Sequence, residues 1–115
     1  MTTPEGRVVQ ELIRMCDKFG WPQRKVAYEG YVGAPDRMVI APGRLFFVEC
    51  KAPGKKPAPV QAREHDRIRH GGVQVYVCDS EESVRYVFNH VRALVREAAF
   101  KPGVGCRHPL NEETK

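Results

Sequence analysis

Asp36, Glu49 and Lys51 are the residues whose types and spacing could support chemistry. Asp36 opens a run of strand-forming residues, segment 36–41, and Glu49 and Lys51 end a second run, segment 44–51. Pro42-Gly43 separates the two runs, so they are predicted to form a β-hairpin. A regular hairpin centred on this turn places Asp36 opposite Glu49, with Cβ atoms roughly 5 Å apart, whereas an odd-length loop or a bulge would shift the pairing.

The facing carboxylates indicate a metal site. Like charges on directly opposed strand positions destabilise a sheet unless something neutralises them. A divalent cation would do so, and oxygen ligands favour Mg²⁺ or Mn²⁺. Lys51 shares a strand face with Glu49, and its ammonium could position a water or stabilise charge on a phosphorane. The alternative is an ordinary solvated Glu-x-Lys ion pair, with Asp36 merely starting a strand.

The remaining pattern predicts the elements that would position these residues. Apolar residues recur at helical spacing from Thr2 to Phe19, and Gly20 follows as a stop. The order α-β-β-β-α-β-α predicts a single α/β domain with a mixed central sheet flanked by helices. Besides the first helix and the hairpin, the predicted elements are an edge strand at 23–28, a polar helix at 60–69 and a strand at 73–78. A last helix follows, capped by Asp79 or Ser80.

Composition narrows the class of protein. The chain has 115 residues, which fits one domain, and no apolar run approaches the roughly 20 residues of a membrane span. No signal-peptide core follows the N-terminus, so we expect a cytoplasmic protein with no membrane partner. The net charge of +5 mildly favours a polyanionic partner such as nucleic acid. No two cysteines form a C-x-x-C pair, so Cys16, Cys50 and Cys78 are expected to be buried free thiols.

The sequence resembles the VRR-Nuc branch of the PD-(D/E)xK nucleases over about residues 1–95. The motifs are Glu5 in the first helix, Gly33-Ala-Pro-Asp36-Arg, Phe47-Val-Glu49-Cys-Lys51-Ala, Gln61 in the next helix and Gly72-Val-Gln-Val-Tyr-Val before the last helix. The family usually has a valine at the position of Cys50, which is a small apolar change. The resemblance implies a restriction-endonuclease-like nuclease domain at 1–99, followed by an irregular tail at 100–115.

The resemblance also implies roles for the matched residues. Asp36 and Glu49 would bind Mg²⁺ or Mn²⁺ together with the backbone carbonyl of Cys50, and Lys51 would be the catalytic lysine. Glu5 would reach the metal from the first helix, directly or through a water. The spacing Thr2-x-x-Glu5 also fits a helix capping box, which is the alternative role for this glutamate.

Gln61 and a group of basic residues complete the predicted site. Gln61 would orient the phosphate or the water, and the alternative is a solvated helix residue. The candidate phosphate contacts that flank the site are Lys55, Lys56, Arg63 and Arg67, together with Arg69, His65 and His70. Any single one of them could equally belong to a solvated loop or helix face.

Small stand-alone members of this family resemble phage-borne enzymes that cut branched DNA as dimers. By that resemblance we expect a metal-dependent endonuclease that hydrolyses DNA phosphodiester bonds, acts as a homodimer and resolves four-way (Holliday) junctions. Its location would be the host cytoplasm if the chain is phage-encoded. The alternatives are a flap or nicking nuclease, or a non-catalytic nucleic-acid-binding protein on the same fold. The intact set of Asp36, Glu49 and Lys51 argues against the non-catalytic alternative.

Overall fold

The computed structural model describes residues 2–99, and the predicted tail at 100–115 lies outside the described residues. Helix α1 spans Pro4–Phe19. Thr3 caps it by accepting a hydrogen bond from the Gly6 N–H at 2.9 Å, so the capping box between Thr2 and Glu5, the alternative role of Glu5, is not formed. The reason is that Pro4, whose fixed φ suits the first helical position, makes the residue before it the cap. Gly20, at φ 72°, ends the helix.

The central sheet has four strands in the order β1-β2-β3-β4. The strands are β1 (Gln23–Lys25), β2 (Arg37–Ala41), β3 (Arg44–Cys50) and β4 (Gln74–Cys78). The first two pairs are antiparallel, and β3 pairs with β4 in parallel, as the crossover through helix α2 (Pro59–His70) requires. The predicted mixed α/β sheet is therefore confirmed, although β1 is shorter than the predicted segment 23–28.

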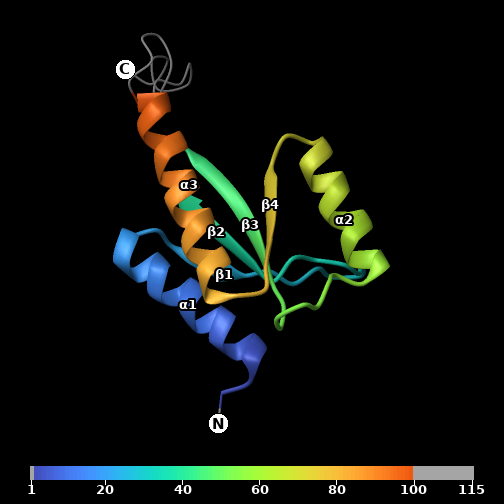
Figure 1. Cartoon of the computed structure of the whole chain (residues 1–115). Helices are drawn as coiled ribbons and strands as arrows, with labels where there is room; N and C mark the ends of the chain where they lie inside the picture. The colour runs from blue at the N-terminus through green and yellow to red at the C-terminus, as the bar shows by residue number, and fades with distance from the viewer. Residues whose placement is uncertain (1, 100–115) are drawn as a thin grey trace.

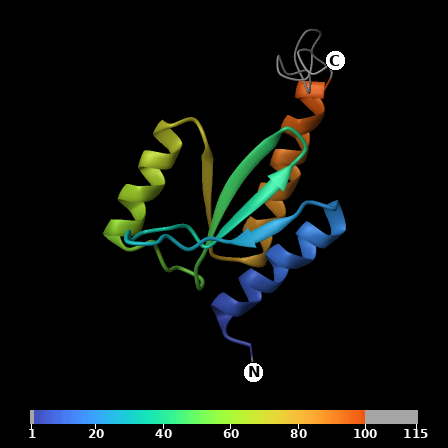
Figure 2. The ribbon, with the colours of Figure 1, turned by 180° about the vertical axis from the view of Figure 1, so that it is seen from behind.

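The helices cover the two faces of this sheet unequally. Helix α3 (Glu81–Ala99) packs on α1, and both cover one face, whereas α2 lies beside β4 (Figures 1 and 2). Ser80 caps α3 by accepting a hydrogen bond from the Ser83 N–H at 3.0 Å. Within residues 2–99, no helix is both long and apolar enough to cross a membrane.

The core lies between the sheet and the α1–α3 pair. Phe46, Val48 and Cys50 of β3 are buried there, which leaves Glu49 and the alternate residues on the opposite face. Trp21 is buried and stacks on Phe88, with ring centroids 5.5 Å apart, so it is a packing residue. The buried members of α1 and α3 include Val8, Leu12, Met15, Cys16, Val84, Val87 and Val91. Cys16, Cys50 and Cys78 are buried free thiols, as predicted.

The predicted hairpin register is confirmed, but the strands are shorter than expected. Ala41 pairs with Arg44 across Pro42-Gly43, and the ladder continues to the pair Arg37 and Val48. Asp36 and Lys51 lie just outside their strands. Both residues still bond to a neighbouring segment, because the Val26 N–H donates to the Asp36 carbonyl at 3.0 Å and the Lys51 N–H donates to the Cys78 carbonyl at 2.9 Å.

Candidate active site

Asp36 joins the two strands of the hairpin at the open end of the ladder. Its position follows directly from the register, because the pair Arg37 and Val48 precedes it. The carboxylate oxygen Oδ2 accepts a hydrogen bond from the Cys50 N–H at 2.8 Å. Asp36 thus caps the end of β3 through its side chain and lies beside Glu49, whose carboxylate it influences electrostatically. The two predicted carboxylates are brought together.

Glu49 is the most enclosed charged residue of the site, with 1% of its surface exposed. Its Oε2 atom lies 3.2 Å from Lys51 Nζ and accepts a hydrogen bond from Gln61 Nε2, also at 3.2 Å. Lys51 Nζ in turn donates to Gln61 Oε1 at 3.0 Å. Glu49, Lys51 and Gln61 therefore form a closed polar network between β3 and α2, which differs from the solvated ion pair considered as the alternative.

Gln61 has a second partner that explains its orientation. Its Oε1 atom also accepts a hydrogen bond from the Ala58 N–H at 2.9 Å, at the beginning of α2. The same side chain thus satisfies one of the free backbone donors of the helix and points its amide nitrogen at Glu49. Gln61 is not a solvated helix residue, because both ends of its amide are engaged.

The other oxygen of Glu49 has no partner. Among residues 2–99, the buried side-chain atoms without a hydrogen bond are Glu49 Oε1 and His65 Nε2, and these two atoms face each other at 3.5 Å. Burial first, and then the negative charge of Asp36, raise the pKa of Glu49. Burial, followed by the charge of Arg69, lowers the pKa of His65, which favours a neutral imidazole.

His65 is the residue of this site that we did not predict correctly. We considered it only as a possible phosphate contact, yet it is 1% exposed and lies against Glu49. Its spacing was an available signal. His65 follows Gln61 by four residues, so a helix that directs Gln61 toward Glu49 directs His65 to the same face.

Glu5 and Asp36 line one cavity beside α1. A cavity of about 310 Å³ lies between α1 and the start of β2. Glu5 is exposed at its rim. The lining residues are Glu5, Val9, Lys25, Val26, Ala34, Pro35, Asp36 and Arg37. Glu5 and Asp36 thus border the same space, and the predicted approach of Glu5 to the metal stays a prediction.

The donors of this site fit a hard divalent cation through Asp36 and Glu49. Both supply carboxylate oxygens, and Glu49 Oε1 is a buried acceptor that lacks a donor. A cation there would stabilise the charged carboxylate of Glu49, whose pKa is raised first by burial and then by the charge of Asp36. Across residues 2–99, no three His, Cys, Asp or Glu side chains are gathered closely enough to hold a metal by themselves, so Glu5 is not a third close ligand.

The predicted basic residues divide into two groups. Lys55, Lys56 and Arg63 are exposed and available to an anion. Arg67 is also exposed but forms an ion pair with Glu64 at 2.9 Å. Arg69 has a structural contact instead, because its guanidinium donates to the Val75 carbonyl at 2.7 and 3.1 Å.

Comparison with known proteins identifies the family. No family model matches the chain. The chain is 44% identical over 79 residues to a curated protein named "Putative nuclease p44" from Acyrthosiphon pisum secondary endosymbiont phage 1, a match that covers 68% of this chain and 85% of that protein. A solved structure titled "VRR_NUC domain" superposes with a TM-score of 0.73 at 42% identity and covers 77% of this chain and 98% of that one. Together with the geometry at Asp36, Glu49 and Lys51, these matches show that the chain belongs to the VRR-Nuc family of nucleases.

Proposed function

We propose that this nuclease is an endonuclease that hydrolyses DNA phosphodiester bonds with a Mg²⁺ or Mn²⁺ ion held at Asp36 and Glu49. The observation that carries the proposal is the unpartnered Oε1 atom of Glu49, a nearly inaccessible acceptor beside a second carboxylate. A buried carboxylate without a donor costs free energy, and a bound ligand would offset that cost. A divalent cation supplies that compensation, and the exposed cations Lys55, Lys56 and Arg63 provide the positive surroundings that a polyanion requires.

Each residue of the network then has a distinct task. Asp36, Glu49 and the Cys50 carbonyl would hold the ion, and Glu5, which lines the same cavity as Asp36, would reach it through a water. When bound, the ion supplies positive charge that polarises a phosphoryl oxygen and lowers the pKa of a water. Lys51 carries its ammonium next to Glu49 and stabilises negative charge that develops on the phosphorus oxygens. Gln61, fixed by the Ala58 N–H, orients Lys51 and the attacking water.

Cleavage of a labelled DNA by purified protein tests this assignment. Wild-type protein should cut in Mg²⁺ or Mn²⁺ and not in EDTA, and Lys51→Ala should lower kcat by orders of magnitude. Lys55→Ala is the matched control, because it removes the same charge four residues away on an exposed loop. We expect it to change affinity slightly and kcat hardly at all. Retention of most activity in folded Lys51→Ala protein would refute the catalytic role of Lys51.

We further propose that the enzyme acts as a homodimer on branched DNA, as a resolvase of four-way junctions. Each chain contributes one Asp36–Glu49–Lys51 site, and symmetric cutting of two strands needs two sites related by a two-fold axis. Helix α3 is the surface proposed for the dimer contact, since it exposes 70% of Tyr86. The predicted contribution of the tail beyond Phe100 lies outside the described residues.

Two measurements separate this proposal from its alternatives. Light scattering at micromolar concentration, with and without DNA, should report a dimer, and a strict monomer would exclude a resolvase. Competition of a labelled four-way junction against linear duplex, a flap and single strands at fixed salt should favour the junction, because salt sets the non-specific affinity. If a flap or linear duplex were cut faster than the junction, the nuclease proposal would stand and the resolvase proposal would be wrong. Binding without cutting in any metal would indicate the non-catalytic alternative.

A further inference from the structure

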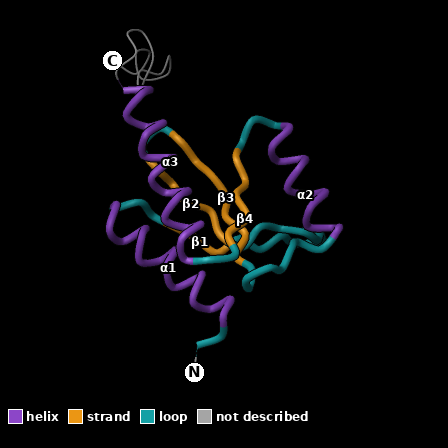
Figure 3. The backbone as a smooth tube through the Cα atoms, in the orientation of Figure 1, coloured by secondary structure: helices purple, strands orange, loops and turns teal. Residues whose placement is uncertain are grey.

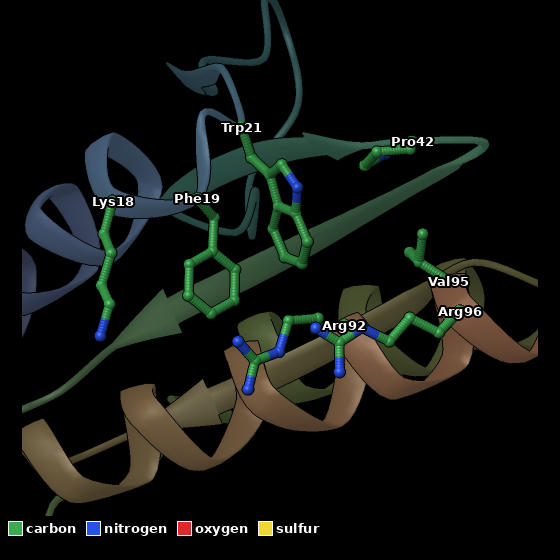
Figure 4. A pocket seen from close by; sticks show the side chains of 7 residues that line it. All are labelled: Lys18, Phe19, Trp21, Pro42, Arg92, Val95 and Arg96. Atoms are coloured by element: carbon green, nitrogen blue, oxygen red, sulfur yellow. The ribbon is translucent and has the colours of Figure 1, made fainter.

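A second concave site lies at the turn end of the hairpin, away from Glu49. It is a pocket of about 340 Å³ between the C-terminal end of α1, the hairpin turn and the second half of α3 (Figure 4). The lining residues are Lys18, Phe19, Trp21, Pro42, Arg92, Val95 and Arg96. No residue of the proposed catalytic network belongs to it.

The pocket combines positive charge with aromatic surface. Lys18, Arg92 and Arg96 supply three cations, and no carboxylate lines the pocket. Within residues 2–99, neither Lys18 nor Arg92 takes part in an ion pair. Phe19 and Trp21 contribute rings, in edge-to-face contact at 4.9 Å, as Figure 4 shows. Trp21 is largely buried against Phe88 and Arg92 lies over Phe19, so the rings border the pocket without forming a stacking platform. Three cations beside apolar ring surface suit an anion with an apolar part, as a phosphate-bearing nucleotide has.

Arg92 is already held in position for such a ligand. Its guanidinium lies over the Phe19 ring at 5.1 Å from the centroid, and its Nη2 atom donates to Asn89 Oδ1 at 3.2 Å. A guanidinium that stacks on a ring keeps its edge N–H donors available for an oxyanion. Because the side chain is ordered before binding, it loses less conformational entropy when an anion arrives.

The pocket and the catalytic network lie at opposite ends of the hairpin, the pocket on the α1–α3 side of the sheet and Glu49 on the other face. Asp36 precedes β2 and Pro42 follows it, which separates them by roughly 20 Å at about 3.3 Å per strand residue. Helix α1 gives the same length, because Glu5 lines the cavity at Asp36 and Lys18 lines this pocket. From Glu5 to Lys18 the helix makes about thirteen steps of 1.5 Å, which again gives roughly 20 Å. Figure 3 shows α1 and the hairpin as continuous elements between the two ends.

We infer that this pocket binds a phosphate-bearing nucleotide of the nucleic-acid substrate at a distance from the bond that is cut. The inference rests on the proposed action on DNA. A separation of roughly 20 Å corresponds to about six base pairs, since successive phosphates of one strand rise 3.4 Å along the duplex axis. The pocket would therefore sense whether a duplex arm extends about six base pairs from the cleavage point.

The experiment compares Arg92→Gln with Arg85→Gln. Both substitutions remove one positive charge from α3. Arg85 lies outside the pocket and pairs with Glu11, and Glu11 keeps Arg14 as a partner when Arg85 is replaced. Anisotropy of labelled DNA in EDTA measures affinity for junctions with arms of four and of twelve base pairs. Arg92→Gln should weaken binding of the long arms roughly three- to ten-fold and lower the slope of log affinity against log salt by about one. Short arms should be bound equally by all three proteins.

Four outcomes would overturn the inference. Equal effects of Arg92→Gln and Arg85→Gln would mean that net charge alone matters, and a loss that persists on short arms would place the contact elsewhere. If Arg92→Gln bound DNA as tightly as wild type, and wild type still cut DNA, the pocket would have no role in DNA binding and the proposed function would stand. Arg96→Gln, whose side chain is not over Phe19, repeats the test in case Arg92→Gln melts at a lower temperature. Failure of the wild type to bind any nucleic acid would overturn the proposed function as well.

Discussion

Glu49→Gln is predicted to stabilise the metal-free protein while it removes catalysis. Glu49 is 1% exposed and its Oε1 atom has no donor. In the variant, the amide oxygen can replace Oε2 and accept from Lys51 and Gln61. The amide nitrogen then replaces Oε1 and can donate to His65 Nε2, which lies 3.5 Å from that position. One substitution thus satisfies both unpartnered buried atoms.

The expected gain is the difference between two opposing contributions. Removing a buried, unsatisfied acceptor and its charge is worth about 1–3 kcal/mol. Replacing the charge-assisted hydrogen bond from Lys51 by a neutral one costs about 1 kcal/mol, which is limited because Lys51 is 18% exposed and can reach water. The net stabilisation is about 1 kcal/mol, or a rise in Tm of about 4–8 °C for a domain of this size.

Thermal unfolding in EDTA measures this effect, with Glu64→Gln as the matched control. Glu64 is also largely buried, but Tyr28 Oη donates to it at 2.7 Å and Arg67 at 2.9 Å, and the Tyr28 hydrogen bond is the first cause of its lowered pKa. Its replacement should lower Tm, so the two glutamine variants should move in opposite directions. A fall in Tm for Glu49→Gln as large as that for Glu64→Gln would refute the argument that Glu49 is strained without metal.

The pH dependence of the stability difference between wild type and Glu49→Gln gives a second check. Burial and Asp36 raise the pKa of Glu49 above its ordinary value of 4.5, so the folded state binds this proton more tightly than the unfolded state does. The wild type therefore loses stability relative to Glu49→Gln as pH rises above 4.5. The gap between the two proteins should be widest near neutrality and should shrink as pH falls toward 4.5. A gap that stays constant over this range would contradict the assigned cause.

Three further predictions use the same protein and melting assay. Mg²⁺ should raise the Tm of the wild type and hardly change that of Asp36→Asn, because an ion that binds only the native state stabilises it by mass action; equal shifts would count against a site at Asp36. The lowered pKa of Glu64 contributes stability above pH 4.5, so the advantage of wild type over Glu64→Gln should shrink as pH falls below 4.5, and an advantage that stays constant on acidification would contradict this. Gly33→Ala should lower Tm by more than Gly43→Ala, since both have positive φ but only the Cβ at 33 meets backbone, at 2.8 Å; equal losses would argue against that contact.

The hairpin and the core were predictable because they depend on local periodicity. Alternation in 44–51 assigns Phe46 and Val48 to one face and Glu49 to the other, and Pro42-Gly43 leaves a single register that keeps this assignment. The apolar stripes of the first and last helices similarly specify the faces that they bury. The ends of the strands were less predictable, because they depend on where the neighbouring strand stops pairing, which for β1 is Lys25.

The surroundings of Glu49 were harder to predict, because α2 has no apolar stripe that would specify its orientation. Its buried residues are Glu64 and His65, both polar, so hydrophobic periodicity does not indicate which side faces the sheet. The position of Gln61 followed from the family resemblance alone, and its hydrogen bonds to Ala58 and Lys51 appear only in three dimensions. The catalytic roles themselves stay a prediction until the variants are measured.

The loop between β1 and β2 supports α2 from the side of Gly33 and Tyr28. At Gly33, φ is +98°, and a Cβ there would lie 2.8 Å from the Val60 carbonyl, so the loop backbone rests directly on the first turn of α2. Tyr28 from the same loop donates to Glu64 one turn further along. Asp36 ends this loop, and Gln61 and His65 lie on the helix that the loop supports. The loop therefore sets the distance between the two carboxylates and the polar face of α2. Any change that lifts the loop from α2 should disturb Asp36 and Gln61 together, without entering the core between the sheet and the α1–α3 pair.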